Sequence, residues 1–479
     1  MTRFTDCPPE VIVEICRQLL LPLQTEQHAY NLSADISTDN SLACRIALAR
    51  LMRTCRKLHD AAGCMLYSGY YRNHHPSKAV TFLKTLDPYE GSSRPELVRH
   101  ADLHHNLYES SSDDINWSKV QENMTKDLWI NRLAGALGMH LPDGWNRCRI
   151  GMQFDHVLEH ISQMFLTYLP ALTSLDVSLC HNWKFDLLQQ WTENRPSGRS
   201  NLLPNLRHLK IQMRSTKARK CKAHQIVLEG APRLCTLEIY NSMSYTVPSQ
   251  CQLVNLRSLK LNNCSMDLSS MTEVLTATPN ITHFEYRGVP SGTEPSRERL
   301  LGPQMLCNLL RNEYDLAASQ ASDTAKEELP NLHRQLRTLK IDLHSTEFLF
   351  DWDDSETITS LQDFSEIRNL SIDTHSFTSR TGNQNHLIMN NIGKMIPQRL
   401  ETLEISRVGE FLLQELVQIG LREIADSVRQ GQFRQLRRIE LTDCVVHGHR
   451  PTQQKALHDL REMFDIPGAP SVYLNGKAL

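Results

Sequence analysis

A short alternation of apolar and polar residues recurs along most of the chain. It is clearest over residues 256–264, where the order is apolar, two polar, apolar, polar, apolar, two polar, cysteine. Apolar residues separated by one polar residue predict a short strand, with Leu259 and Leu261 on one face. Nine copies of this frame begin at Leu172, Leu206, Leu234, Leu256, Ile281, Leu336, Ile367, Leu400 and Leu436.

Helical segments alternate with these strands in a fixed order. Residues 154–169 have apolar residues at helical spacing, Pro170 ends the helix, and the strand at Leu172 follows. Residues 271–275 and 388–396 repeat this order, because each predicted helix is followed by a proline and then by a strand. The pattern therefore predicts a helix–strand repeat.

The intervals between the strands are uneven. Successive copies begin 34, 28, 22, 25, 55, 31, 33 and 36 residues apart. The longest interval needs additional structure, and residues 300–312 predict a helix within it. Residues 98–103 fit the frame loosely and predict a tenth strand near the N-terminal end. Residues 106–150 follow no clear frame beyond a helical stretch at 120–137.

The frame matches the strand of a leucine-rich repeat, L-x-x-L-x-L-x-x-N/C. The chain therefore resembles leucine-rich-repeat proteins, with irregular repeats. This resemblance implies an α/β solenoid with parallel strands on the concave face and helices on the convex face.

The first seventy residues follow a helical pattern instead. A helix is predicted over 7–20, with two prolines in its first turn and with Val11, Ile15 and Leu19 on one stripe. A polar loop is expected at 22–41. A second helix is then predicted over 42–58, followed by a short third segment that ends in tyrosines Tyr67, Tyr70 and Tyr71.

These N-terminal segments resemble an F-box. The family opening, Leu-Pro-x-Glu-apolar-x-x-x-Ile-x-x-x-Leu, is matched by Pro8, Glu10, Val11, Ile15 and Leu19, with Cys7 in place of the first leucine. The Cys-Arg-Lys core of the second helix is present at 55–57. The run at 47–56, with the tyrosine-rich end, is most similar to fungal F-box proteins that carry divergent leucine-rich repeats.

The resemblance implies a substrate-recognition subunit of a Skp–cullin–F-box (cullin–RING) ubiquitin ligase. Residues 1–72 would be the F-box domain that binds the Skp-type adaptor, and residues 73–479 the solenoid that binds a protein substrate. The candidate adaptor-binding residues are Pro8, Pro9, Glu10, Ile12, Ile15, Leu19, Leu51, Cys55 and Leu58. Some of them must hold the helices together, and the pattern does not sort them. The alternative is a leucine-rich-repeat scaffold with no ubiquitin role, whose N-terminal helices only cap the array.

The polar residue between the last two apolar positions of the frame is the main candidate contact for a substrate. The residues at this position are Asp176, Lys210, Glu238, Lys260, Glu285, Lys340, Ser371, Glu404 and Glu440. In a parallel sheet in register they are lateral neighbours. The alternating signs favour a charge ladder that helps to set the register. The other interpretation is that Ser371, Glu404 and Glu440 leave an acidic patch for a basic partner.

Composition and charge narrow the classes further. The chain has 479 residues, 40% hydrophobic residues and a formal net charge of −2, so no global charge favours nucleic acid or an anionic membrane. No apolar run approaches the roughly 20 residues that span a bilayer. We expect a monomer in the cytoplasm or nucleus. The 13 cysteines contain no C-x-x-C pair, which is evidence against a disulfide framework and a zinc ribbon.

Motifs for catalysis are lacking in the sequence. We find no phosphate-binding glycine loop, no His-Glu-x-x-His and no Gly-x-Ser-x-Gly. The histidines at 100–105 and 447–449 have no ligand partners at a metal-site spacing. The basic run at 214–222 lacks interleaved aromatic residues and is typical of a solvated loop. We therefore expect no enzyme activity, no cofactor, no metal and no nucleic-acid partner.

Overall fold

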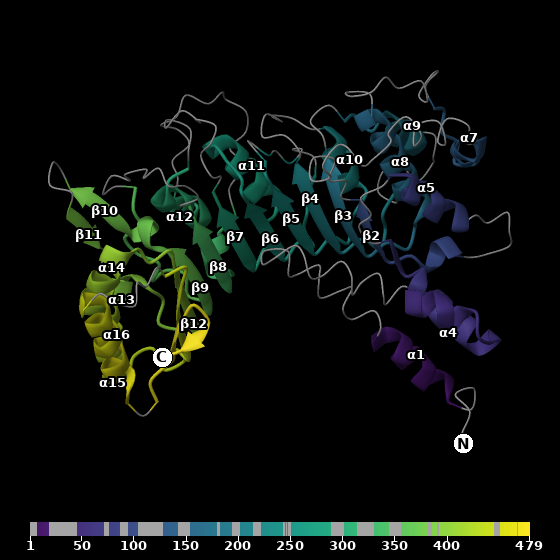
Figure 1. Ribbon diagram of the computed structural model, residues 1–479. Helices are drawn as coiled ribbons and strands as arrows, with labels where there is room; N and C mark the ends of the chain where they lie inside the picture. The colour runs from purple at the N-terminus through teal and green to yellow at the C-terminus, as the bar shows by residue number, and fades with distance from the viewer. Residues whose placement is uncertain are drawn as a thin grey trace. The chain divides into compact units, whose positions relative to one another are not determined.

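The computed structural model has a mixed α/β fold whose strands are mostly parallel (Figure 1). Two compact units make up the chain: Met1–Ser178, Trp183–Leu209 and Lys222–Arg233 form the first, and Leu179–Asn182, Lys210–Cys221 and Leu234–Leu479 form the second. The residues that the structure describes are 7–18, 46–70, 76–86, 94–103, 128–141, 154–179, 183–193, 202–213, 222–242, 245, 247, 251–288, 301–313, 330–343, 356–381, 386–389, 392–444, 451–466 and 468–479.

The first unit begins with helices and continues into helix–strand repeats. Its elements are α1 (Pro9–Gln18), α4 (Arg56–Leu66), β1 (Gly69–Tyr70), α5 (Pro76–Thr85), η3 (Arg94–Leu97), β2 (His100–Leu103), α7 (Leu128–Ala136), α8 (Phe154–Tyr168), β3 (Ser174–Leu179), α9 (Asp186–Glu193) and α10 (Lys222–Glu229). The boundary between the units falls within β4 (His208–Met213).

The N-terminal helices differ from the sequence prediction in one respect. The helix predicted over 42–58 is interrupted, because helical residues 46–52 end in a turn and α4 begins only at Arg56. The Thr54 hydroxyl donates a hydrogen bond to the Leu51 carbonyl at 2.7 Å, which competes with continued helical bonding. The predicted loop at 22–41 lies outside the described residues.

The residues that follow α4 form a strand that the pattern does not predict. β1 pairs in parallel with β2, with Tyr70 opposite Ala101. The Tyr70 ring lies with its centroid 5.1 Å from that of Phe82 and 5.0 Å from that of Phe165, on α5 and α8. The sheet of this unit therefore begins before residue 73. β2 pairs with β3 and confirms the tenth strand predicted at 98–103.

The second unit contains the longest run of parallel strands. Its elements are β5 (Thr236–Tyr240), β6 (Ser258–Asn262), α11 (Leu268–Ala277), β7 (His283–Arg287), α12 (Pro303–Arg311), η7 (Leu332–Arg334), β8 (Thr338–Asp342), β9 (Asn369–Asp373), η8 (Thr374–Phe377), β10 (Thr378–Thr381), β11 (His386–Met389), α13 (Ile392–Met395), β12 (Thr402–Ser406), α14 (Glu410–Glu415), the π-helical turn η9 (Leu416–Leu421), α15 (Arg422–Arg429), β13 (Arg438–Thr442), α16 (Pro451–Phe464), β14 (Ser471–Leu474) and β15 (Lys477–Ala478).

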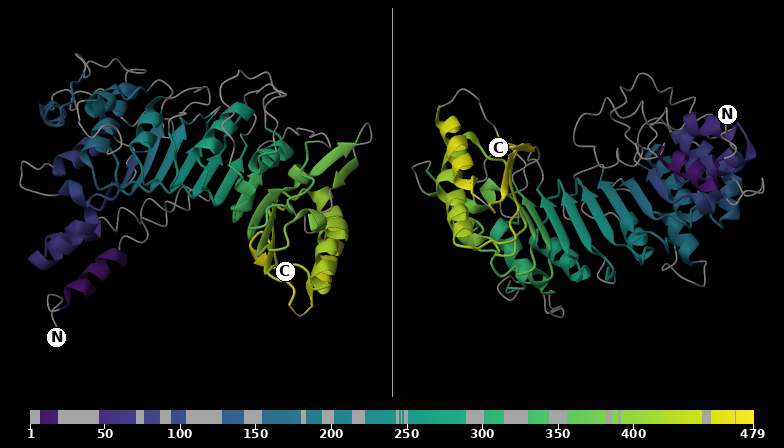
Figure 2. Two further views of the ribbon diagram at one scale, coloured as in Figure 1. Left: turned by 180° about the vertical axis from the view of Figure 1, so that it is seen from behind. Right: turned by 90° about the horizontal axis from the view of Figure 1, so that it is seen from below.

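The register of these strands is set by the apolar positions of the frame. β5 to β9 lie side by side in sequence order, as the teal and green strands in Figure 2 show. β12, β13 and β14 follow them in the sheet. One rung consists of buried apolar residues that face one another in register: Leu237, Leu259, Phe284, Leu339, Leu370, Leu403 and Ile439. Burying each side chain contributes about 1.5–3 kcal/mol, so a one-residue slip would be costly.

All nine strands predicted from the frame are present, whereas the helix predicted over 388–396 is confirmed only in its second half, as α13. Residues 386–389 form β11, which pairs antiparallel with β10, and α13 is a single turn. A short apolar run is compatible with either a strand or a helix, so its periodicity alone could not decide. The strands β14 and β15 were also not predicted.

Several strands of the second unit end in the same backbone conformation. Asn241, Asn263, Arg407, Asp443 and Asn475 directly follow β5, β6, β12, β13 and β14, and each has a φ between 47° and 57°. This left-handed conformation is tolerated best by glycine and next by asparagine and aspartate. Four of the five residues are asparagine or aspartate, and Arg407 is the exception.

Candidate functional surfaces

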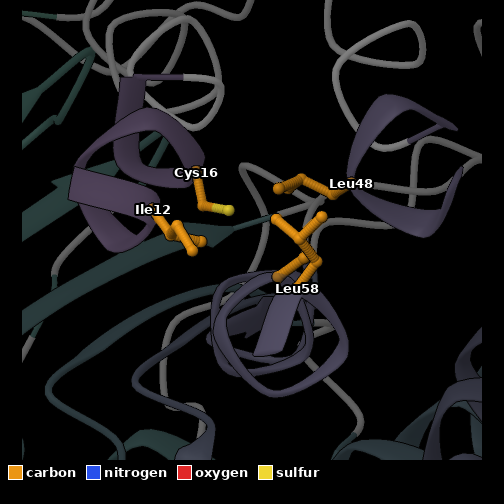
Figure 3. Packing of buried hydrophobic residues seen from close by; sticks show 5 residues of the cluster. Ile12, Cys16, Leu48 and Leu58 are labelled. Carbon is orange, nitrogen blue, oxygen red and sulfur yellow. The ribbon is translucent and has the colours of Figure 1, made fainter. Parts of the chain in front are cut away.

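The N-terminal helices enclose a small apolar core, here called the N-terminal cluster. Its members are Ile12, Cys16, Leu48, Leu58 and Ala62, each at most 4% exposed. Figure 3 shows Ile12 and Cys16 of α1 pointing towards Leu48 and Leu58, which lie on the two following helices. Burial raises the pKa of the Cys16 thiol, so this cysteine packs as a neutral apolar group.

A second set of apolar side chains lies outside this cluster. Val11 is 45% exposed and Ile46 is 42% exposed, although both belong to helices that contribute to the cluster. Ile15 is half-buried and lies one helical turn from Val11, so the two share one side of α1. Pro8 and Glu10 are exposed at the start of the same helix.

The structure thus separates the residues that we predicted as adaptor contacts. Ile12 and Leu58 are buried in the N-terminal cluster and support it from within. Leu51 and Cys55 are half-buried and pack against that cluster. Leu19 lies outside the described residues, and Pro9 is the first residue of α1.

Val11 and Ile46 were not among the predicted adaptor contacts. Val11 belongs to the apolar stripe that we recognised in the sequence, but the stripe does not say which of its edges the neighbouring helices cover. No sequence signal identified Ile46.

The second candidate surface is the polar side of the strands in the second unit. Glu238, Lys260, Glu285 and Lys340 are neighbours on β5, β6, β7 and β8, as the frame predicts. Lys260 Nζ lies 2.5 Å from Glu238 Oε1, and Arg287 Nε lies 2.8 Å from Glu285 Oε1. These residues are partly exposed, so each pair contributes at most about 1 kcal/mol.

The carboxylates further along the sheet are also paired. Lys340 Nζ lies 3.6 Å from Glu404 Oε2, on the far side of Ser371. Arg438 Nη2 lies 2.8 Å from Glu440 Oε2. Because both glutamates have a cation in contact, this arrangement favours the charge ladder over an acidic patch.

The remaining two ladder positions have different neighbours. Asp176 on β3 faces Asp102 on β2, so the alternation of charge does not extend to this pair. Lys210 Nζ lies 5.1 Å from the centroid of the Tyr240 ring, a distance that allows a cation–π contact.

The ends of β8 and β9 carry a denser polar network. The Asp373 carboxylate is fully buried and accepts hydrogen bonds from the backbone N–H groups of Leu343 and Ser376 and from the Ser376 hydroxyl. Asp342 ends the neighbouring strand and binds Arg407. The network stabilises the strand ends and leaves no side chain in it unpaired.

The described part of the chain holds neither a cluster of metal-ligating side chains nor a membrane-spanning helix. No three His, Cys, Asp or Glu side chains come together there as a possible metal site. Among the same residues, no helix combines the length and the apolar character needed to cross a bilayer. No family model matches this chain, and no curated protein was found to be similar to it.

Proposed function

We propose that this protein is the substrate-recognition subunit of a Skp–cullin–F-box ubiquitin ligase. In this proposal the N-terminal helices bind a Skp-type adaptor, and the repeats hold a protein substrate. The observation that carries the proposal is the exposed apolar edge of α1, Val11 with Ile15, beside a cluster that is already complete without it. An apolar helix edge of this kind fits a groove on a partner.

The mechanism that we propose is positional. The protein performs no bond chemistry itself; it holds a substrate close to the enzyme that carries ubiquitin. Tethering raises the effective concentration of substrate lysines at that enzyme. Such a role suits a protein of the cytoplasm or nucleus, and it needs no cofactor.

A second candidate is a repeat scaffold without a ubiquitin role. Its support is the pairing of β1, directly after α4, with β2. In this alternative the helices before β1 shield the first strands from solvent, as terminal caps do in repeat proteins. The two candidates differ in whether the exposed edge of α1 binds an adaptor.

Capture of a purified Skp-type adaptor by the full-length protein separates the two candidates. Val11→Asp places a charge on the exposed edge and should abolish capture while leaving the melting temperature unchanged. Val254→Asp is the matched control, because Val254 is 48% exposed and lies in the second unit. The scaffold would be favoured if the wild-type protein failed to capture the adaptor, or if Val11→Asp captured it as well as the wild type did.

A further inference from the structure

Two turns of the second unit have the same four-residue sequence. The sequence Arg-Gln-Leu-Arg occupies 334–337 before β8 and 434–437 before β13. The leucine of each copy is buried, whereas both arginines of each copy are exposed. The two turns therefore place four guanidinium groups at the amino ends of the strands: those of Arg334, Arg337, Arg434 and Arg437.

Two strands, β9 and β12, lie between these turns. At their amino ends the charged side chains form ion pairs with one another. Arg399 Nη1 lies 3.0 Å from Glu366 Oε1, and Arg368 Nη1 lies 3.4 Å from Glu401 Oε1. Each pair joins the turn before β9 to the turn before β12. The centre of this edge is thus neutral.

The outer arginines have no such compensation. Among the residues that the structure describes, Arg334, Arg337 and Arg437 contact no carboxylate, and Arg434 donates only to the Gly431 carbonyl. The row formed by the amino ends of β8, β9, β12 and β13 is here called the amino edge. The amino edge is therefore positive at β8 and β13 and neutral at β9 and β12.

Backbone hydrogen bonds fix the spacing of the two ends. The N–H of Arg368 donates to Arg337 O at 2.9 Å, that of Glu401 to Arg368 O at 2.7 Å, and that of Arg437 to Glu401 O at 2.9 Å. The strands follow one another in the order β8, β9, β12, β13, the first three of which are labelled in Figure 1. Three strand intervals of about 4.8 Å separate Arg337 from Arg437 by about 14 Å.

We propose that this edge binds an extended acidic peptide segment of a protein partner. An extended chain advances about 3.4 Å per residue, so two acidic positions about four residues apart would reach both ends. Arginine binds carboxylates through two parallel hydrogen bonds, which suits it to this role. A nucleic acid fits less well, because its evenly spaced phosphates would also meet Glu366 and Glu401 at the centre.

The inference deepens the proposed function, on which it rests for the assignment of the repeats as the part that holds a partner. The test uses full-length protein and fluorescence anisotropy with labelled peptides. One peptide, Asp-Asp-Ser-Gly-Asp-Asp, has two acidic pairs four residues apart. A second peptide, Ser-Asp-Asp-Asp-Asp-Gly, has the same amino-acid composition, but its four acidic residues are contiguous.

The spaced peptide should bind more tightly than the contiguous one. Arg337→Gln and Arg437→Gln should each weaken binding of the spaced peptide about fivefold, the effect of losing one exposed charge contact. Arg257→Gln is the matched control, since Arg257 is exposed at the same frame position before β6 and its Nη1 donates to the Asn280 carbonyl. That variant should bind like the wild type, and circular dichroism should show all variants folded.

Three results would overturn the inference. The first is equal binding of the two peptides, and the second is unchanged binding of the spaced peptide by the Arg337→Gln and Arg437→Gln double variant. The third is an oligothymidylate of equal charge that binds more tightly than the spaced peptide and loses this binding in the same double variant. Adaptor capture distinguishes this inference from the proposed function. The arginine variants should capture the adaptor normally, and Val11→Asp should still bind the spaced peptide.

Discussion

Arg407 binds Asp342 through two hydrogen bonds that pass across an intervening strand. Its Nε donates to Asp342 Oδ1 at 2.9 Å, and its Nη2 donates to Oδ2 at 3.3 Å. Asp342 ends β8, Arg407 follows β12, and β9 lies between these two strands. Arg407 has a left-handed conformation with a φ of 57°, which arginine rarely adopts.

Arg407→Ala should destabilise the second unit in a pH-dependent way. Burial and the nearby Asp373 raise the pKa of Asp342, and Arg407 partly offsets this. A raised pKa in the folded state means that ionising Asp342 costs stability as the pH rises through that pKa. Without Arg407 the cost grows, so we expect a loss of about 1 kcal/mol at pH 7 and a smaller loss at pH 4.

Urea unfolding at the two pH values measures this loss. Arg368→Ala is the control, because it removes an exposed pair with Glu401 and should cost less than about 0.5 kcal/mol. An equal loss for Arg407→Ala at both pH values would show that Asp342 is not the group responsible.

Asn263 tests the repeated left-handed turn without a change in packing. Its side chain is exposed and its φ is 51°. Asn263→Gly should leave the free energy of unfolding unchanged or raise it, whereas Asn263→Val should lower it by about 1–2 kcal/mol, because a branched residue is strained at this φ. Denaturant unfolding of both variants gives the comparison. Similar stability of the glycine and valine variants would contradict the assigned turn.

His100 should make the first unit less stable in mild acid. Burial lowers the pKa of His100, and the nearby His208 and Arg99 lower it further. As the pH falls through the ordinary histidine value of about 6.5, the unfolded chain takes up a proton that the folded chain resists, so stability is lost. His100→Gln should reduce the slope of stability between pH 7 and pH 5. Melting temperatures across this range give the measurement, and His140→Gln is the control because His140 is exposed. An unchanged slope in the His100→Gln variant would show that His100 is not involved.

Ile12 and Val11 are neighbours in sequence but should differ sharply on substitution. Ile12→Ala empties part of the N-terminal cluster and should cost about 2–5 kcal/mol. Val11→Ala removes an exposed side chain and should change stability by less than about 0.5 kcal/mol. Chemical denaturation followed by far-ultraviolet circular dichroism provides the measurement, and equal costs would contradict the orientation of α1.

The strand frame could be predicted because the period of the sequence and the packing of the sheet place the same residues on one face. Leu259 and Leu261 must both be buried, and a period of two places them on one face, so the sequence pattern and the packing agree. The neighbours of Lys260 followed from the same register. β1 could not be predicted, because a Gly-Tyr pair has no period; Phe82 and Phe165 decide the position of Tyr70 from elsewhere in the chain.

The candidate surfaces were harder to predict than the strands. Ile12 and Val11 lie on one apolar stripe, and only the neighbouring helices determine that Ile12 is covered and Val11 is not. Likewise, Arg337 and Arg368 have equivalent places in the frame. Glu401 neutralises Arg368 only because β12 follows β9 in the sheet, although residues 374–401 contain the separate hairpin of β10 and β11.

The length of three strands that precede a left-handed residue does not depend on the length of the connecting segment after each of them. β5, β6 and β12 each contain five residues, although the next copy of the frame begins 22, 25 and 36 residues later, respectively. An insertion beyond the turn therefore leaves the order of side chains across the sheet unchanged. Connecting segments of different lengths are thus compatible with one fixed spacing of charges on the sheet.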